Sequence, residues 1–402
     1  MEAYIIDGIR TPIGSYQGAL SEVRADDLGA LVIKAVAERN PEIPLSAYDD
    51  VILGCANQAG DDNRNVARMS LLLAGLPETV PGETVNRLCS SGLSAIIHAN
   101  RAIKAGDGDV FIAGGVENMT RGPLVISKSS KGYGTDSKMY DSSFGWRFVN
   151  PKMKEMYGVE GMGETAENLV AKYNISREDQ DKFALNSQMK AKKAQESGRL
   201  AEEIVNVEIP QRKGDAKVVA QDEFLKPTST LEGLGKLRAA FKKEGSVTAG
   251  NSSGLNDGAA AVIVASEDAV KKYNLKPLAR IVSSAVVGVS PSIMGIGPVE
   301  AANKALAKAG LKMEDMDIIE LNEAFAAQSL ACIREWGLQD DDARINPNGG
   351  AIAIGHPLGV TGARTAYSAA LELNKTKKRY ALVTMCIGVG QGYAAILERY
   401  QS

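Results

Sequence analysis

The sequence predicts an α/β protein in which two strand–helix regions are separated by a different kind of segment. Short apolar strands alternate with helical patterns from Met1 to about Thr120, and again from about Lys271 to the end of the chain. The middle, roughly Arg121 to Ala249, is more charged and less sheet-like. Such alternation is typical of layered folds whose sheets are largely buried. We expect the middle to be an insertion that folds over the α/β body.

The apolar runs of both regions have the length of buried strands. In chain order they are DDVILG and DVFIAGG in the first region, then MDIIEL, RYALVTMC and YAAILE in the second. A helix is expected between the first two, over Ser91–Ala105, because small and apolar residues fill it and Gly106 follows. The middle contains a helix that begins with Arg177–Asp179 and stops at Gly198. Residues 247–266 then return the chain to a buried strand.

The two regions also share an order of elements. Residues 89–115 predict a glycine-containing turn, a helix of small residues and a strand that ends in glycines, and residues 359–390 repeat that order. Unrelated α/β proteins can show the same order, so duplication is supported only moderately. The length of 402 residues suits two or three domains.

Composition excludes several classes of protein. A net charge of −3 argues against a general nucleic-acid or anionic-membrane surface. The N-terminus lacks the pattern of a signal peptide, and no apolar run is long enough to span a bilayer. The four cysteines and two histidines show no metal-ligand spacing, so we expect no metal. The prediction is a cytosolic (cytoplasmic) protein with free thiols.

Cys89, in NRLCSSGLSA, lies at the start of the predicted helix. The positive end of a helix dipole stabilises a thiolate, which favours a nucleophile, whereas a small buried hydrophobe is an equally frequent role. A nucleophilic cysteine needs a base.

His98 is on the opposite side of the same helix and is expected to be structural. His356 follows an apolar run predicted as a buried strand, sits in a turn before a helix expected near Thr361, and is the better candidate.

Two further residues end predicted strands. Cys386 begins CIGVGQG, whose glycines favour close approach of backbone N–H groups to a ligand oxygen, and a thiol there suits acid–base chemistry. The same glycines allow a weaker reading, a dinucleotide-dependent oxidoreductase, which the YAAILE strand argues against. Asn322 opens NEAFAAQ; a helix N-cap is the simpler role, and an amide that fixes a water or carbonyl is the alternative.

Together NRLCSSG, NEAFA, GGAIAIGHPLGVTGAR and CIGVGQG, in this order, resemble the thiolase family over essentially the whole chain. The resemblance implies a five-layer α-β-α-β-α fold made of two similar halves. It implies a first half of residues 1–120 plus 250–270, a loop domain of 121–249 that binds coenzyme A (CoA) and makes oligomer contacts, and a second half of 271–402. A homodimer or homotetramer is also implied.

By the same resemblance, Cys89 would accept the acyl group, His356 would take its proton, and Cys386 would move the proton at the α-carbon of acetyl-CoA. One oxyanion hole would consist of His356 and a water held by Asn322. The other would use the backbone N–H groups of Cys89 and Gly388. The implied reaction is cleavage of a 3-ketoacyl-CoA by CoA, a co-substrate rather than a permanent cofactor.

CoA would lie across the loop domain, with Lys226 near its nucleotide or, equally well, a solvated surface lysine. The other residues expected along it are Met162, Leu234, Phe241, Ala249, Ser253, Gly254, Met294, Ala324 and Phe325. Gly161 stands where acetoacetyl-CoA thiolases usually carry histidine, which implies a degradative enzyme of fatty-acid or aromatic breakdown. DDVILGCANQAGDDNRNVARM and FGWRFVNPKM look like 3-oxoadipyl-CoA thiolases.

Arg147 would bind the substrate's terminal carboxylate, against the simpler role of a surface or interface ion pair. An acetyl-CoA acetyltransferase is the runner-up, and a non-catalytic acyl-CoA-binding relative is the alternative from another class.

Overall fold

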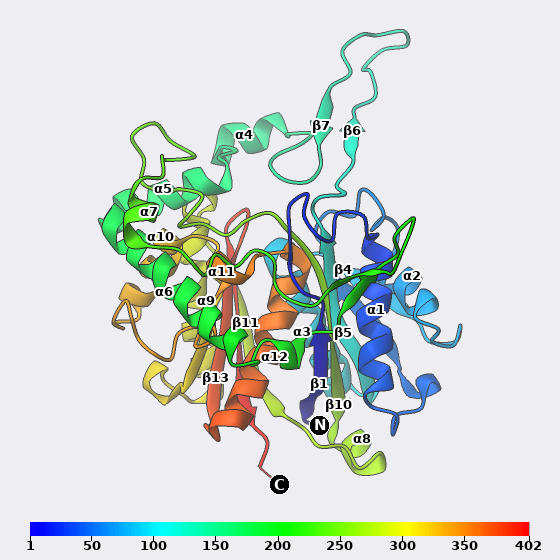
Figure 1. Cartoon of the computed structure of the whole chain (residues 1–402). Coiled ribbons are helices and arrows are strands. Elements are labelled where there is room, and N and C mark those ends of the chain that lie inside the picture. The colour runs from blue at the N-terminus through cyan, green and yellow to red at the C-terminus, as the bar shows by residue number, and fades with distance from the viewer. Residues whose placement is uncertain (402) are drawn as a thin grey trace.

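The computed structural model describes residues 1–401, and its longer strands lie in two groups at the centre (Figure 1). The first group has the order β4-β3-β5-β10-β1, with β3 parallel to β4 and β5 and the remaining pairs antiparallel. Its strands are β1 (Ala3–Arg10), β3 (Asp50–Gly54), β4 (Gly82–Val85), β5 (Val110–Asn118) and β10 (Asn256–Ser266). The strands predicted from DDVILG, DVFIAGG and residues 247–266 are therefore present.

The second group has the order β12-β13-β14-β11. It consists of β11 (Ala279–Gly288), β12 (Ile318–Leu321), β13 (Tyr380–Ile387) and β14 (Gln391–Arg399). Only Tyr4–Arg280 and Ile5–Ala279 pair β1 with β11, so this short seam joins the two groups into one path. Because YAAILE lies in β14 rather than in a helix, the glycine-rich tail does not form a dinucleotide-binding turn, and the oxidoreductase reading is wrong.

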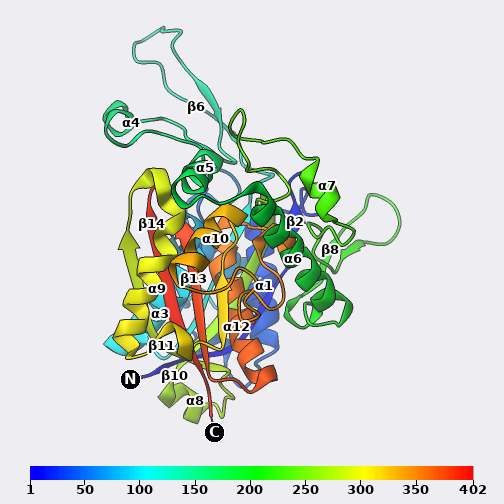
Figure 2. The ribbon, with the colours of Figure 1, turned by 90° about the vertical axis from the view of Figure 1, so that its left-hand side faces the viewer.

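Three layers of helices cover these strands. The middle layer is α3 (Ser91–Ala105) with α12 (Leu358–Thr376), which pack together. The outer layers are α1 (Ala25–Glu38) with α2 (Val66–Leu73), and α9 (Gly297–Ala309) with α10 (Ala326–Glu335); Figure 2 shows α9 beside β14. The five-layer α-β-α-β-α prediction is confirmed.

Alternation along each strand explains the layering. In β3, Val51 and Leu53 pack into the outer core, whereas Ile52 packs into the middle core. In β13, Leu382 faces the other outer core, whereas Val383 joins the middle core. Side chains of successive residues point to opposite faces of a sheet, so strands buried on both faces need continuous apolar sequence.

The inserted segment lies over this body and carries short elements. These are β6 (Leu124–Ile126), β7 (Met139–Asp141), α4 (Pro151–Tyr157), α5 (Met162–Tyr173), α6 (Arg177–Glu196), β8 (Val207–Ile209), β9 (Lys217–Val219) and α7 (Leu231–Gly235). The β6–β7 hairpin projects from the body at the top of Figure 1. The Ser176 hydroxyl caps α6, and Gly198 (φ 79°) follows its last turn, as predicted. The proposed domain boundaries stay a prediction.

Two sequence predictions near His356 are wrong in detail. The run AIAI is a short helix, α11 (Ala351–Ile354), rather than a buried strand, and Gly355 (φ 110°) ends it. The next helix, α12, begins at Leu358 rather than near Thr361, because Pro357 suits the position before a first helical turn. The remaining elements are β2 (Gly14–Ser15) and α8 (Glu267–Lys272).

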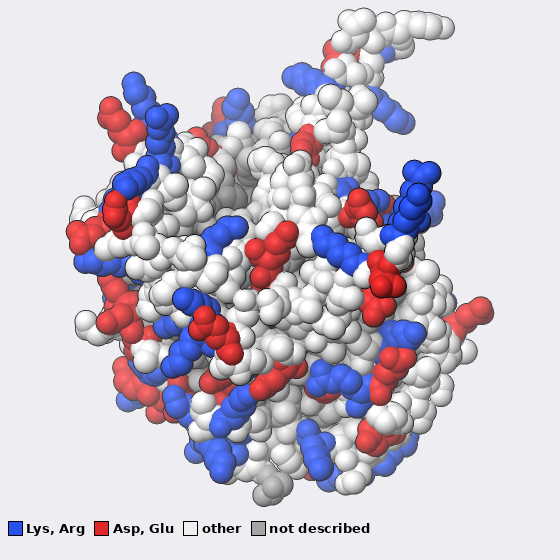
Figure 3. Space-filling model, viewed as in Figure 1, with Lys and Arg blue, Asp and Glu red and all other residues white. Residues whose placement is uncertain are grey.

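No helix among residues 1–401 has the length and apolar character needed to cross a membrane. On the face shown in Figure 3, basic and acidic residues are intermixed over the surface. That pattern agrees with the small net charge of −3.

Candidate active site

Cys89 lies in a 3-10 turn, Leu88–Ser90, directly before α3. Leu88 has a left-handed backbone (φ 46°), and its N–H donates to the Asn86 side chain at 2.8 Å. Small residues are required beside this turn, because a Cβ on Gly92 would approach the Gly359 carbonyl oxygen to 2.6 Å. Gly92 therefore lets α3, the helix that follows Cys89, meet the first turn of α12.

The Cys89 thiol is partly exposed and lies close to the backbone N–H groups of Gly388 and of Cys89 itself, which lower its pKa. Burial has the larger effect and raises the pKa of Cys89 to about 11. The expected stabilised thiolate is thus wrong for the unliganded protein: desolvation outweighs the helix N-terminus, and the sulfur is protonated. A base must remove that proton.

Cys386 occupies the end of β13 and is buried. It is near enough to Cys89 for the other thiol's charge to raise its pKa, although burial is the main cause of that rise. Cys386 packs in one apolar cluster with Met294, Ala324 and Phe325. The two thiols and the Gly388 N–H therefore lie near one another, at the end of β13 and in the turn before α3.

His356 is buried, with 4% of its surface exposed, between α11 and α12. Its Nδ1 is 2.7 Å from the Thr361 hydroxyl, which itself donates to the Pro357 carbonyl oxygen at 3.1 Å. A hydroxyl has one proton, so His356 must donate from Nδ1–H, which leaves the lone pair on Nε2. Burial, helped by the Arg364 charge, lowers the pKa of His356 to about 3, so the imidazole is neutral and can accept a proton.

Asn322 follows β12 and is 1% exposed. Its Nδ2 lies 3.4 Å from His356 Nε2, while its Oδ1 is buried and has no hydrogen-bond partner in the described chain. The N-cap role is wrong, because α10 begins at Ala326 with Phe325 at the cap position. Asn322 is instead turned toward the imidazole, and the alternative role, an amide that fixes a water or a carbonyl, stays a prediction. A buried amide oxygen without a partner is suited to hold a water.

His98, by contrast, lies half-buried on α3 near the charges of Glu83 and Arg101. Burial lowers its pKa. The structural role expected for it stays a prediction.

Residues expected along CoA lie in two places. Lys226, Leu234 and Ala249 line a cavity of about 490 Å³ between the α7 region and α6. Met294, Ala324 and Phe325 pack around Cys386, Ser253 donates to the Ala324 carbonyl oxygen, and the Phe241 ring lies edge-on to Phe325 at 6.0 Å. Met162 lies beside Gly388, since a Cβ on Gly388 would be 3.7 Å from Met162 Sδ. Gly254 packs against the Phe224 ring so closely that a Cβ on Gly254 would clash with it.

Sequence reasoning missed several residues that line the cavity. They are Gln188, Phe224, Thr228, Ser229, Thr230, Gly233, Leu237, Gly250 and Ile352. The exposed Lys226 extends over the Phe224 ring, 5.9 Å from its centre, and the Gln188 side chain accepts from the Lys226 backbone N–H. The run of threonine and serine beside Lys226 was the available signal, since hydroxyls and a lysine suit a phosphate.

Arg147 lies in the loop between β7 and α4. Its guanidinium donates to the Ser142 carbonyl oxygen at 3.1 Å and to Asn57 Oδ1 at 3.3 Å. Within residues 1–401 it forms no salt bridge, so the surface ion pair weighed for it is absent there, whereas the interface ion pair stays a prediction. No carboxylate among the described residues therefore neutralises the charge of the Arg147 guanidinium.

Comparisons with known proteins agree over the whole chain. The family models described as "Thiolase, N-terminal domain" and "Thiolase, C-terminal domain" match residues 3–268 and 275–399. The beta-ketoadipyl-CoA thiolase of Acinetobacter baylyi is 59% identical, and the 3-oxoadipyl-CoA/3-oxo-5,6-dehydrosuberyl-CoA thiolase of Escherichia coli is 58% identical, each over 99% of both chains.

A solved structure, that of the Bacillus anthracis acetyl-CoA acetyltransferase, superimposes with a TM-score of 0.90 at 40% identity and covers 99% of each chain. Family models, relatives and fold all agree with the four quoted motifs. The chain belongs to the thiolase family of acyltransferases.

Proposed function

We propose that this enzyme cleaves a 3-ketoacyl-CoA with CoA, giving acetyl-CoA and an acyl-CoA shortened by two carbons. One observation carries the proposal: two thiols on separate elements, Cys89 and Cys386, lie close enough for their charges to interact, and the Gly388 N–H lies beside Cys89. Acyl transfer needs a nucleophile, and carbon–carbon cleavage needs a separate proton donor for the expelled carbanion. Two adjacent thiols with different surroundings fit these two tasks.

In the first step, the neutral His356 removes the proton from Cys89, and the sulfur adds to the C3 ketone of the substrate. The ketone oxygen becomes an oxyanion, and preorganised N–H donors stabilise such a charge more than water does. The Cys89 and Gly388 N–H groups, or His356 with a water on Asn322, would form that hole. The Nε2 lone pair inferred from the Thr361 contact supports His356 as the base.

In the second step, the oxyanion re-forms its carbonyl and the C2–C3 bond breaks. The electron pair leaves with C2 as the enolate of acetyl-CoA, and Cys386 gives that carbon a proton. The acyl group stays on Cys89 as a thioester. A raised pKa for Cys386 supports this role, because the donor must hold its proton until the enolate forms.

In the third step, CoA enters, loses its thiol proton to the Cys386 thiolate, and attacks the thioester. Cys89 then leaves and recovers its proton from His356. CoA is thus a co-substrate, and no permanently bound cofactor or metal is proposed. The cavity beside Lys226 would hold the nucleotide end of CoA, and the apolar cluster at Met294, Ala324 and Phe325 would hold the pantetheine end.

Cys89→Ser tests this assignment. With a 3-ketoacyl-CoA and CoA, the wild-type enzyme should consume the absorbance of the substrate enolate, and the variant should lose about 10³-fold or more in kcat because a serine hydroxyl is far harder to ionise than a thiol. Binding of CoA, measured by calorimetry, should be unchanged. A variant that still turns over would contradict Cys89 as nucleophile, whereas a wild type that only binds acyl-CoA would support a non-catalytic relative.

We propose 3-oxoadipyl-CoA as the preferred substrate, because relatives named for that substrate are 58–59% identical. Arg147 supports a dicarboxylate, since its guanidinium has no carboxylate partner in the described chain. An acetyl-CoA acetyltransferase acting on acetoacetyl-CoA is the alternative, favoured by the neighbouring structure of that name.

Arg147→Ala should lower kcat/KM for 3-oxoadipyl-CoA by about 10- to 100-fold, the equivalent of one charge-assisted pair, and leave acetoacetyl-CoA within about twofold. Steady-state rates with both substrates measure this selectivity. Arg238→Ala is the matched control and should not discriminate between the substrates. An equal loss on both would end the assignment of Arg147, and a wild type that prefers acetoacetyl-CoA would favour the alternative.

The proposed setting is the cytoplasm, with small-molecule acyl-CoA partners and assembly into a dimer or tetramer. Exposed apolar side chains on the β6–β7 hairpin support assembly, because monomers rarely leave such groups together in water. They include Leu124 (61% exposed), Ile126 (65%) and Met139 (63%).

A further inference from the structure

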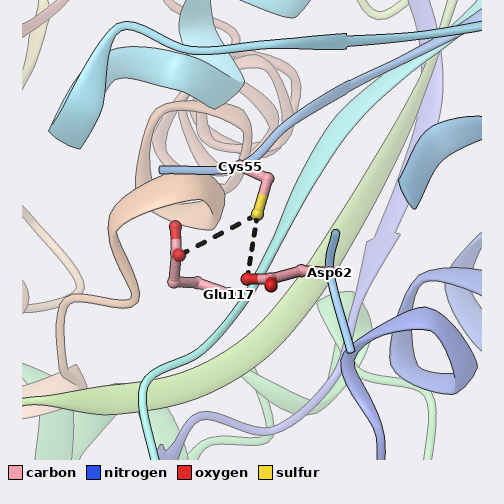
Figure 4. A group of neighbouring side chains, drawn as sticks. All are labelled: Cys55, Asp62 and Glu117. Atoms are coloured by element: carbon pink, nitrogen blue, oxygen red, sulfur yellow. Dashed lines mark hydrogen bonds between the residues drawn. The ribbon is translucent and has the colours of Figure 1, made fainter. Parts of the chain in front are cut away.

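Glu117 is a buried carboxylate that the proposed chemistry does not use. It lies at the end of β5, is 1% exposed, and sits beside Cys55 and Asp62 (Figure 4). Within residues 1–401 no arginine or lysine forms a salt bridge with it. A buried carboxylate without a cation is costly, so its presence calls for a function.

The contacts of this cluster argue against a metal. Glu117 Oε1 accepts the Asn57 N–H at 3.0 Å, and its Oε2 accepts the Ala56 N–H at 2.9 Å and the Gly359 N–H at 2.8 Å. The Cys55 Sγ lies 3.4 Å from Asp62 Oδ2 and 3.9 Å from Glu117 Oε1, so its thiol is closer to Asp62 (Figure 4). Both Glu117 oxygens are thus occupied by N–H donors, whose positive ends would repel a cation.

The Gly359 contact ties Glu117 to the proposed base. Gly359 belongs to the first turn of α12, the turn whose Thr361 hydroxyl holds His356 Nδ1 at 2.7 Å. The approach of β5 to this turn is as close as backbones allow, because a Cβ on Gly115 would lie 1.8 Å from the Gly359 carbonyl oxygen. Any shift of this turn would move the imidazole.

The other two contacts tie Glu117 to the loop after β3. The Asn57 side chain of that loop accepts from Arg147 at 3.3 Å and donates to the Ser142 hydroxyl at 3.4 Å. Glu117 is also close enough to Cys89 for its negative charge to raise the pKa of that thiol. The carboxylate therefore touches the surroundings of both the base and the nucleophile.

We propose that Glu117 is a positioning residue that fixes the first turn of α12, and through it His356, relative to Cys89. The inference rests on the proposed function, in which His356 takes the Cys89 proton. An N–H at the start of a helix has no partner within the helix, and an anion there is favourable, so the carboxylate anchors the turn. The anchor has an electrostatic cost, because the same charge opposes formation of the Cys89 thiolate.

Glu117→Gln separates the anchoring of the first turn of α12 from the effect of the Glu117 charge on the Cys89 thiolate. The amide has one acceptor oxygen, so its NH₂ group must face either the Asn57 N–H or the Ala56 and Gly359 N–H groups. In either orientation the side chain can no longer hold the loop after β3 and the first turn of α12 together. We expect kcat to fall by about 100-fold, because small displacements of catalytic groups are expensive, with KM within about twofold. Alkylation of Cys89 by iodoacetamide, mapped by mass spectrometry at pH 8, should become at least about twofold faster, because one negative charge is gone.

A loss of fold alone would not give this pair of results, since unfolding would also expose Cys55, Cys332 and Cys386 to alkylation. Asp49→Asn is the matched control: Asp49 accepts the N–H groups of Asp109 and Val110 at the other end of β5. It should leave both turnover and Cys89 alkylation unchanged. Burial raises the pKa of Glu117 to about 7, with Asp62 the facing charge, so an inflection of the Cys89 alkylation rate near pH 7 should be lost in Glu117→Gln.

Unchanged kcat in Glu117→Gln, or slower Cys89 alkylation in a folded variant, would overturn the proposal. Should that variant not fold, Glu117→Asp keeps the charge but shortens the side chain, so kcat should fall about tenfold or more with Cys89 alkylation near the wild-type rate. Wild-type kcat in Glu117→Asp would overturn it as well. Alkylation requires no acyl-CoA, so a wild type inactive on every 3-ketoacyl-CoA would end the proposed function and still leave Glu117 testable.

Discussion

At the scale of single residues, burial rather than ion pairing sets the protonation states of the side chains in the candidate site. Burial keeps His356 neutral and both Cys89 and Cys386 protonated, so no ion pair stands ready in the free enzyme. In the proposed mechanism, attack begins with proton transfer to His356. Burial opposes the resulting imidazolium, so its attraction to the new oxyanion, which is strong in surroundings of low dielectric constant, must offset that cost.

Asn322→Ala tests the proposed water site. The substitution removes the amide beside His356 Nε2 and should lower kcat by about 10²-fold, the usual loss for one oxyanion-hole donor, while KM for CoA stays within about twofold. Steady-state kinetics measure both. Gln328→Ala is a control for a neighbouring buried amide on α10. A larger effect on KM than on kcat would contradict the role of Asn322.

The low pKa of His356 predicts a specific dependence of stability on pH. In the folded protein His356 titrates at about 3, whereas in the unfolded chain its ordinary value is about 6.5. Between these values the unfolded chain binds the extra proton, so this residue lowers stability as pH falls from about 6.5 toward 3, and its effect is absent above that range. His356→Asn should remove this contribution.

Denaturant unfolding of both proteins at pH 8 and at pH 5 gives the measurement. The wild type should lose more stability than His356→Asn between the two values, and a difference between the proteins that is independent of pH would contradict the buried neutral imidazole.

At the scale of elements, the catalytic turns are held by glycines at contacts between backbones. A Cβ on Gly54 would lie 2.3 Å from the Ser91 carbonyl carbon at the start of α3, and one on Gly362 would lie 2.4 Å from the Leu93 nitrogen. These residues explain why the quoted motifs are rich in glycine. The strands and helices must touch before Cys89 and His356 can face one site.

Gly54→Ala tests this packing. The methyl group cannot avoid rigid backbone, so the variant should lose about 3 kcal/mol of unfolding free energy, at the upper end for overpacking. Denaturant unfolding followed by circular dichroism measures the loss. Gly235→Ala, where a Cβ would meet no atom within 4 Å, is the control and should change stability by less than about 0.5 kcal/mol. Equal stability of the two variants would contradict the backbone contact.

Much of this level could be predicted from sequence. Apolar runs such as YAAILE predict β14, and Gly106 predicts the end of α3. Both predictions succeed because the spacing of apolar residues and the backbone conformation of a glycine are local properties of the sequence. AIAI was mistaken for a strand because a four-residue apolar run has no period to read. Asn322 was mistaken for a cap because the delay of α10 to Ala326 depends on contacts with residues distant in sequence, such as the pairing of Phe325 with Ser252.

The candidate site was only partly predictable for the same reason. Cys89, His356, Cys386 and Asn322 stand out through their motifs, whereas Glu117 and Gln188 carry no local signal. Their importance arises from partners far along the chain, Gly359 for one and Lys226 for the other. The lowered or raised pKa values also come from burial, which a linear sequence does not display.

At the scale of the whole molecule, the inserted segment provides most of the lining of the cavity proposed for CoA, and it provides the projecting β6–β7 hairpin. We expect the hairpin to join subunits. Ile126→Glu should place a charge in that contact and reduce the mass measured by light scattering to that of a smaller assembly. Val218→Glu, at an exposed apolar residue of β9, is the control and should leave the mass unchanged. An unaltered mass in Ile126→Glu would contradict this use of the hairpin.

The short seam between β1 and β11 has a consequence for biosynthesis. Cys89 is translated early, whereas His356 and Cys386 lie close to the carboxyl terminus. In the proposed mechanism, a nascent polypeptide that already has the Cys89 thiol would still lack His356, the base that activates it. We therefore expect acyl transfer to begin only after the second group of strands has docked along the β1–β11 seam.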